Sequence, residues 1–277
     1  MKRFFILATA AIVALASCVK SEVVYKDAPQ QIAFKQITGA MTKAPTNLDV
    51  AVSLGVIAHD ATGAEYFGNT AFTNTTGYWA ADKYWPYEGA LTFTVYAPAA
   101  DDASFANDVL TVNDVTAADA LYYGTARVTT TKVDAVPVLL KHISAQITVN
   151  VDLGDAYELD GTAALTLTAP TTEGNVTVTY GESVTVATAT ATTTSDLTLT
   201  SGTPVYVLPG AQTSIVVKFK QTSAPYQEYE KEITLDENWV ANTKYTYNIG
   251  ITAPDQIKFS AQVDDWAGPE TVGKNLN

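Results

Sequence analysis

Two histidines, His59 and His142, are the only imidazole groups in the 277-residue chain, so acid–base catalysis has few candidate residues. A zinc site of the His/Cys type needs several ligands at close spacing, which two histidines and one cysteine do not supply. The acidic residues within 152–160 depart from the ligand spacing of a calcium loop. The chain also lacks a Gly-x-Ser-x-Gly elbow, a phosphate-binding loop and a dinucleotide fingerprint. We therefore expect no catalytic residue, no metal site and no cofactor.

Cys18 is the only cysteine, and it follows a positively charged start and an apolar run. This order is typical of a secretory signal peptide, and about 13 apolar residues are too few for a spanning helix, which needs roughly 20. The string Leu15-Ala16-Ser17-Cys18 resembles the lipobox of bacterial lipoproteins, in which the thiol receives a diacylglycerol. We predict a lipoprotein signal peptide over residues 1–17 and lipidation of Cys18. The alternative is an ordinary signal peptide with a cysteine near its end.

The composition indicates a folded and acidic protein. Hydrophobic residues make up 47% of the chain, which supports real cores and argues against disorder. A single cysteine excludes a disulfide framework, so stability must come from packing. The net charge of −13 disfavours electrostatic binding to nucleic acid.

Alternation of apolar and polar residues at every second position is the dominant pattern, and it is typical of half-buried antiparallel strands. The alternation is clearest at residues 50–56, 91–95, 143–151, 176–180, 215–219 and 245–251. Helical periodicity is weak, and only residues 101–119 could hold a turn or a short helix. The threonine-rich residues 187–195 fit either a strand edge or a loop. We therefore predict an all-β fold.

The phase of this alternation changes near residue 140. Apolar residues occupy even positions from Val136 to Leu140 and odd positions from Ile143 to Val151. A shift of one residue turns every side chain to the other face of a sheet, which indicates a bulge or a passage between sheets. We predict a polar tether over residues 18–30 and two tandem antiparallel β-sandwich domains. They span residues 31–138 and 139–277, and the second includes a C-terminal strand and tail.

Aromatic residues gather just before the predicted strand at 91–95. Tyr78, Trp79 and Tyr84 are candidates for stacking on a glycan, because exposed rings can bury their apolar faces against sugars. The alternative is that these rings cover the hydrophobic core. We favour the core for Trp85, and less strongly for Tyr78 and Trp79.

Several short segments keep a common order and spacing over nearly the whole chain. They are Ile32-Ala33-Phe34 with Thr42-Lys43-Ala44, Tyr84-Trp85-Pro86 before Leu91-Thr92-Phe93, Val138-Leu139-Leu140-Lys141-His142, Trp239-Val240-Ala241-Asn242-Thr243-Lys244-Tyr245, and Ile257-Lys258-Phe259 with Asp265-Trp266. Together they resemble the fimbrillin-like (Mfa-like or FimA-type) lipoproteins of Bacteroidales bacteria, the subunits of type V pili. The resemblance implies transthyretin-like sandwiches and a non-enzymatic pilus subunit or surface adhesin. It also implies a location at the cell outer membrane, as a surface-exposed lipoprotein, or in the fimbrium.

The resemblance also implies an assembly mechanism. In this family a trypsin-like protease removes an N-terminal strand, and a strand of the next subunit fills the groove by β-strand addition. Ile32 and Phe34 would belong to the removable strand, and Lys43 would be the processing site. The family often carries Arg where this chain has Lys43, so a Lys-accepting protease and no cleavage both stay open.

At the other end of the chain, Ile257, Phe259 and Val263 alternate with polar residues. They belong either to a donated strand or to a strand that closes the second domain's own sheet. The expected partners are other pilin subunits by β-strand addition, the outer membrane through lipid on Cys18, and a host or bacterial surface ligand. The alternative function is a surface glycan-binding lipoprotein that uses Tyr78, Trp79 and Tyr84.

Overall fold

The computed structural model describes residues 29–36, 52–74, 77–117, 122–181, 185–265 and 272–274. Within these ranges the regular structure consists of strands, which confirms the predicted all-β fold. None of the described residues forms a helix long and apolar enough to cross a bilayer. Cys18, Lys43 and Trp266 lie outside the described residues.

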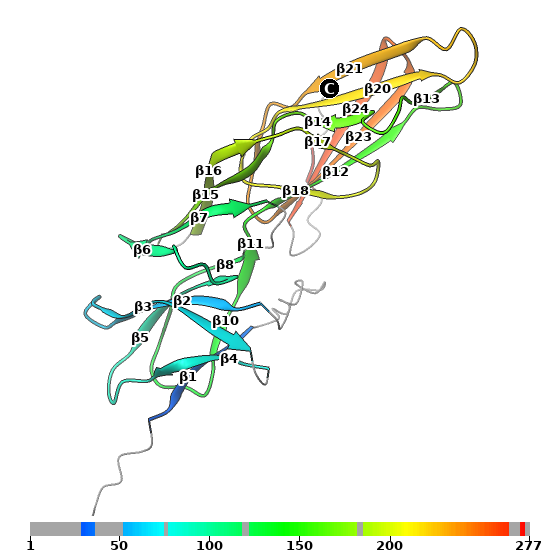
Figure 1. The fold of residues 1–277 in the computed structure, drawn as a ribbon. Coiled ribbons are helices and arrows are strands. Elements are labelled where there is room, and N and C mark those ends of the chain that lie inside the picture. The colour runs from blue at the N-terminus through cyan, green and yellow to red at the C-terminus, as the bar shows by residue number, and fades with distance from the viewer. Residues whose placement is uncertain are drawn as a thin grey trace, which may run out of the picture.

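The N-terminal half forms one strongly curved sheet around its own core, seen in the lower part of Figure 1. The strand order is β10-β1-β4-β3-β2-β5-β8-β11, and β9 pairs with β5. The strands are β1 (Gln31–Gln36), β2 (Leu54–Asp60), β3 (Glu65–Asn74), β4 (Trp79–Tyr84), β5 (Leu91–Ala97), β8 (Tyr122–Gly124), β9 (Val128–Thr130), β10 (Val136–Val138) and β11 (Leu140–His142). Neighbouring strands are antiparallel except for β1 and β10, which run parallel.

A four-stranded sheet, which we call the middle sheet, has the order β16-β15-β7-β6. Its strands are β6 (Ser104–Ala106), β7 (Val109–Thr116), β15 (Thr171–Tyr180) and β16 (Thr185–Thr194). The helical turn considered for residues 101–119 is wrong, because β6 and β7 form a hairpin there. Asn107 and Asp108 make this tight turn with φ values of 52° and 61°, and these residue types tolerate positive φ well.

The C-terminal part contains two five-stranded sheets with one shared core, in the upper part of Figure 1. One sheet has the order β18-β12-β23-β24-β25, and the other has β13-β20-β14-β17 with β21 paired to β20. The strands are β12 (Ala145–Asp152), β13 (Tyr157–Leu159), β14 (Leu165–Leu167), β17 (Leu197–Thr198), β18 (Val205–Val207), β20 (Ser214–Gln221), β21 (Glu228–Thr234), β23 (Thr243–Ala253), β24 (Gln256–Asp265) and β25 (Val272–Lys274), with β19 (Gly210–Ala211) and β22 (Asn238–Trp239) as a separate pair.

The middle sheet joins the two halves of the sequence. It takes β6 and β7 from before residue 138 and β15 and β16 from after it. Its core combines Tyr96 and Leu110 with Ile143, Val178 and Leu208. Sheet membership therefore does not follow the expected boundary at 138/139, and the division into two domains stays a prediction.

His142 lies at the end of β11, close to the predicted change of phase. Leu140 on the same strand packs into the N-terminal core, whereas Ile143 packs into the core of the middle sheet. The imidazole ring lies 4.4 Å from the ring of Tyr122, measured between centroids. Burial, together with the nearby Lys244 ammonium, lowers the pKa of His142 to about 4. The ring is therefore neutral in the folded protein at neutral pH.

This burial predicts a loss of stability in acid. An unfolded histidine titrates near its ordinary pKa of 6.5, so between about pH 6.5 and 4 the unfolded chain binds the extra proton. The free energy of unfolding should fall through this window by up to about 3 kcal/mol from His142. Urea unfolding at pH 7 and pH 4 would measure the fall, and His142→Phe should make it smaller. An equal fall in the parent and the variant would contradict the prediction.

Candidate strand-exchange site

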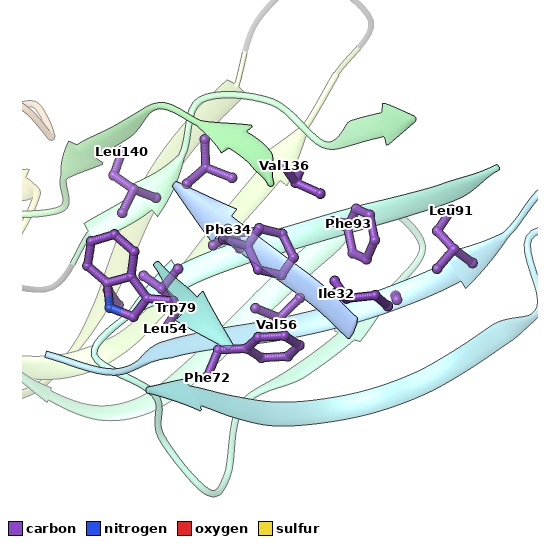
Figure 2. Packing of buried hydrophobic residues seen from close by; sticks show 14 of the residues in the cluster. Ile32, Phe34, Leu54, Val56, Phe72, Trp79, Leu91, Phe93, Val136 and Leu140 are labelled. Atoms are coloured by element: carbon purple, nitrogen blue, oxygen red, sulfur yellow. The ribbon is translucent and has the colours of Figure 1, made fainter. Parts of the chain in front are cut away.

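Strand β1 fills a slot between two strands that are distant in the sequence. It pairs antiparallel with β4, with Phe34 opposite Trp79, and parallel with β10, with Phe34 opposite Val136. Side chains of the strand alternate between its two faces, since Ile32 and Phe34 are fully buried and Lys35 is exposed. Figure 2 shows Phe34 and Ile32 directed into the N-terminal core.

Phe34 is the central ring of that core. Its centroid lies 5.1 Å from the rings of both Phe72 and Phe93, each in an edge-to-face arrangement. Such pairs contribute about 0.5–1.5 kcal/mol beyond burial, and burying a side chain of this size contributes roughly 1.5–3 kcal/mol. Burial of Ile32 and Phe34 in the N-terminal core therefore adds to the backbone pairing that holds the strand.

The N-terminal end of β1 is fixed by hydrogen bonds outside the strand ladder. The Gln30 side chain donates to the Val133 carbonyl at 2.9 Å, and the Gln31 side chain donates to the Ala81 carbonyl at 2.8 Å. The Trp85 backbone N–H donates to the Gln30 carbonyl at 2.9 Å. These bonds fix the register of the strand from its first residue.

Removal of β1 would expose both backbone and core. Among the described strands, β10 pairs with β1 alone, so β10 would lose its attachment to the sheet. The facing edge of β4 would lose its partner as well. Unpaired backbone groups and exposed apolar side chains both raise the free energy of the protein. Binding of a replacement strand would remove both costs.

The C-terminal candidates lie on β24, inside their own sheet. β24 pairs with β23 along its whole length, from Thr243 opposite Asp265 to Ala253 opposite Gln256, and β25 pairs with its other edge. Ile257, Phe259 and Val263 are half-buried against the C-terminal core. Phe259 stacks on Tyr247 at 5.9 Å between centroids.

The three aromatic residues considered for glycan stacking differ in exposure and do not form one exposed surface. Tyr78 and Tyr84 are exposed, but Trp79 is only 4% exposed and donates its indole N–H to the Val52 carbonyl at 2.7 Å. The core interpretation that the sequence favoured therefore holds for Trp79 but not for Tyr78, and Trp79 is not available for stacking on a glycan. Trp85 is buried and lies edge-on to Phe93 at 5.6 Å, which confirms the core interpretation for that ring.

The residues with acid–base chemistry serve structure. His59 lies 3.5 Å from Arg127, whose guanidinium pairs with Asp108 at 2.6 Å. Burial and the Arg127 charge both lower the pKa of His59. In the acidic stretch, Glu158 and Asp160 pair with Lys220 at 3.6 and 3.4 Å. Within the described part of the chain, no cluster of three or more His, Cys, Asp or Glu residues could hold a metal ion.

The site and the fold together define a class of protein: an all-β chain whose first described strand completes a core built from later segments. A model of the fimbrillin-like family matches residues 38–266. The chain belongs to the fimbrillin-like family. No curated protein matches it significantly.

Solved structures share the fold at low sequence identity. A candidate cell adhesion protein from Bacteroides uniformis is 20% identical, with a TM-score of 0.56 over 85% of this chain and 99% of that one. A candidate cell adhesion protein from Bacteroides ovatus is 15% identical, with a TM-score of 0.53 over 88% and 100%. A fimbrilin from Porphyromonas gingivalis is 13% identical, with a TM-score of 0.50 over 88% and 99%. At these identities the likeness shows the fold.

The packing of β1 predicts a sharp contrast between neighbouring residues. Phe34→Ala should lower the free energy of unfolding by about 3–5 kcal/mol, because it leaves a cavity between Phe72 and Phe93. Lys35→Ala, one residue later and exposed, should change it by less than about 0.5 kcal/mol. Urea titrations of both variants would measure the difference. Similar small effects would mean that β1 does not complete the core.

Proposed function

We propose that this protein is a non-enzymatic pilus subunit or surface adhesin that assembles by strand exchange at the β1 slot. It would reach the cell outer membrane as a lipoprotein through Cys18 and then enter a fimbrium. Membership of the fimbrillin-like family supports this function, as do the fold relatives, which include a fimbrilin and candidate cell adhesion proteins. Cleavage after Lys43 would release the folded protein from its lipid, so the anchor serves delivery.

A repeated residue pattern carries the proposal. β1 begins Gln31-Ile32-Ala33-Phe34, and β24 begins Gln256-Ile257-Lys258-Phe259. In both strands Ile and Phe are two residues apart and therefore point to the same face of a sheet. A strand that replaces β1 must place an aliphatic side chain and a phenyl ring at this spacing, since Ile32 and Phe34 occupy fully buried positions. The start of β24 meets this requirement.

Donation of β24 requires its release from β23, because the two strands pair along their whole length. The half-buried state of Ile257 and Phe259 makes this release cheaper than the extraction of fully buried side chains. In the β1 slot both side chains would become fully buried. The transfer would therefore increase the apolar area removed from water, which favours exchange once the slot is empty.

The first experiment tests assembly itself. Cleavage of the purified protein after Lys43 should produce ladders that resist detergent, because an empty slot and a donated strand on each copy allow chains to grow. Gel electrophoresis without boiling would show the ladder. A Lys43→Gln variant treated with the same protease is the matched control and should stay monomeric. A cleaved protein that stays monomeric and native-like would exclude strand exchange for this subunit.

The second experiment tests the donor pattern. A peptide of residues 256–263 added during cleavage should occupy the slot, suppress the ladder and raise the melting temperature of the cleaved protein. A peptide of residues 29–36 should act in the same way. The matched control is the 256–263 peptide with Asp in place of both Ile257 and Phe259, since buried carboxylates would be unpaired in this core. Equal activity of the control peptide would contradict the proposed fit.

A further inference from the structure

The middle sheet ends on one side in an edge strand, β16. Among the described strands β16 pairs only with β15, so its second edge offers unpaired backbone N–H and C=O groups. Its pairing with β15 is regular from Ala191 opposite Gly174 to Thr185 opposite Tyr180, and the register shifts only beyond Ala191. At ten residues it is one of the longer strands of the molecule, and it resolves the strand-or-loop alternative of the sequence in favour of a strand.

Over residues 185–191, β16 lacks the features that normally protect an edge, and its irregular pairing with β15 is confined to the segment beyond Ala191. Natural edge strands are kept short, or carry Lys, Pro or a bulge, because an open edge is a template for pairing with another chain. The sequence Thr-Val-Ala-Thr-Ala-Thr-Ala-Thr-Thr-Thr contains no charge and no proline. Val186 is 51% exposed, Thr188 and Thr190 are exposed on the same face, and Thr192 is exposed at the register shift. Over residues 185–191 the strand is regularly paired on one edge, open on the other among the described strands, and uncharged.

The opposite face of β16 packs against the core of the middle sheet. Ala187 is buried in the core of the middle sheet, and Ala189 packs against that core. The Thr188 hydroxyl hydrogen-bonds to the Thr177 hydroxyl of β15 at 2.8 Å. At its start, the Thr185 hydroxyl donates to the Thr125 carbonyl at 2.6 Å. These contacts hold β16 in position, so its open edge is presented by a supported strand.

We propose that the open edge of β16 binds the same edge of a second copy of this chain, in an antiparallel pair that continues the middle sheet across both molecules. The alternation of Thr and Ala makes the strand self-complementary, since a two-fold arrangement places Thr beside Thr on one face and Ala beside Ala on the other. The Thr177–Thr188 pair is an example of this match within one molecule.

The self-complementary alternation identifies a second copy as the occupant, and charge determines how its binding depends on salt. Each copy carries a net charge of −13, so two molecules repel at long range, and this repulsion opposes the contact least along an uncharged strand. β16 provides such a neutral strip of ten residues. Added salt screens the repulsion, so self-pairing should strengthen as salt rises. A cationic partner would show the opposite dependence.

The expected affinity of one such contact is low. Two paired strands bury less than the roughly 1,200 Å² of a stable standard interface. Copies arranged along a fibre would present the edge repeatedly, and the contacts would then reinforce one another. The edge of β16 belongs to a different sheet from the β1 slot, so lateral pairing does not depend on the proposed strand exchange.

The test compares two charge-matched variants of the full-length protein by sedimentation over a range of concentration and salt. The parent should self-associate weakly, and more strongly at higher salt. Thr190→Lys with Thr192→Lys should weaken the association about tenfold or more, because like charges would meet across the two-fold axis. The control variant, Thr111→Lys with Thr179→Lys, adds the same charge to the inner strands β7 and β15 of the same sheet. Its association constant should stay within about twofold of the parent's. Equal weakening in both variants would overturn the proposal.

Hydrogen exchange on the unmodified protein gives a measurement that does not depend on the variants folding. Amides of residues 185–194 should exchange more slowly as the protein concentration rises, whereas those of the inner strand β15 should not change. Exchange at β16 that does not depend on concentration would overturn the proposal. Protection that appears only after another protein is added would overturn it as well, because the occupant would not be a second copy.

Discussion

The structure of the N-terminal half depends on one constraint: β1 must be hydrogen-bonded on both edges while Ile32 and Phe34 fill the core. Its two neighbours, β4 and β10, come from far along the chain, and β10 has no other partner among the described strands. The first strand therefore completes a structure that the later segments build. The groove that β1 occupies is formed by β4, β10 and the core beneath them, which is the geometry that the proposed strand exchange requires.

The middle sheet has a different role, because it connects the two ends of the molecule. Strands from both halves of the sequence pair within it, and its core includes residues from β2, β5, β7 and β15. Arg127, Asp108 and His59 add a polar contact where this sheet meets the first one. β1 belongs to the N-terminal sheet and β24 to a C-terminal sheet, and the middle sheet lies between these two parts of the sequence.

Much of the fold could be predicted from alternation, because a strand with one buried face repeats every two residues. Ile32 and Phe34 also follow this rule in the structure, although their place in a strand was expected from the family resemblance and not from alternation. The pairing of Phe34 with Val136 could not be predicted, since no local pattern records which distant strand lies alongside. Tyr78 and Trp79 are adjacent in sequence and differ in exposure, because Tyr78 lies in the bend before β4 whereas Trp79 begins β4 and packs into the core. β16 was ambiguous, since an exposed edge strand has only alanines on its buried face.

The double-edged pairing of β1 also has a mechanical meaning. A pull directed along the axis of β1 would load the ladder bonds to β4 and β10 in shear, so that they share the load. Rupture then requires many bonds to yield together, whereas a strand peeled from one end yields bond by bond. A replacement strand seated in this slot would inherit that geometry. If subunits are linked at this slot, as proposed, the same pairing would make the linkage resistant to tension.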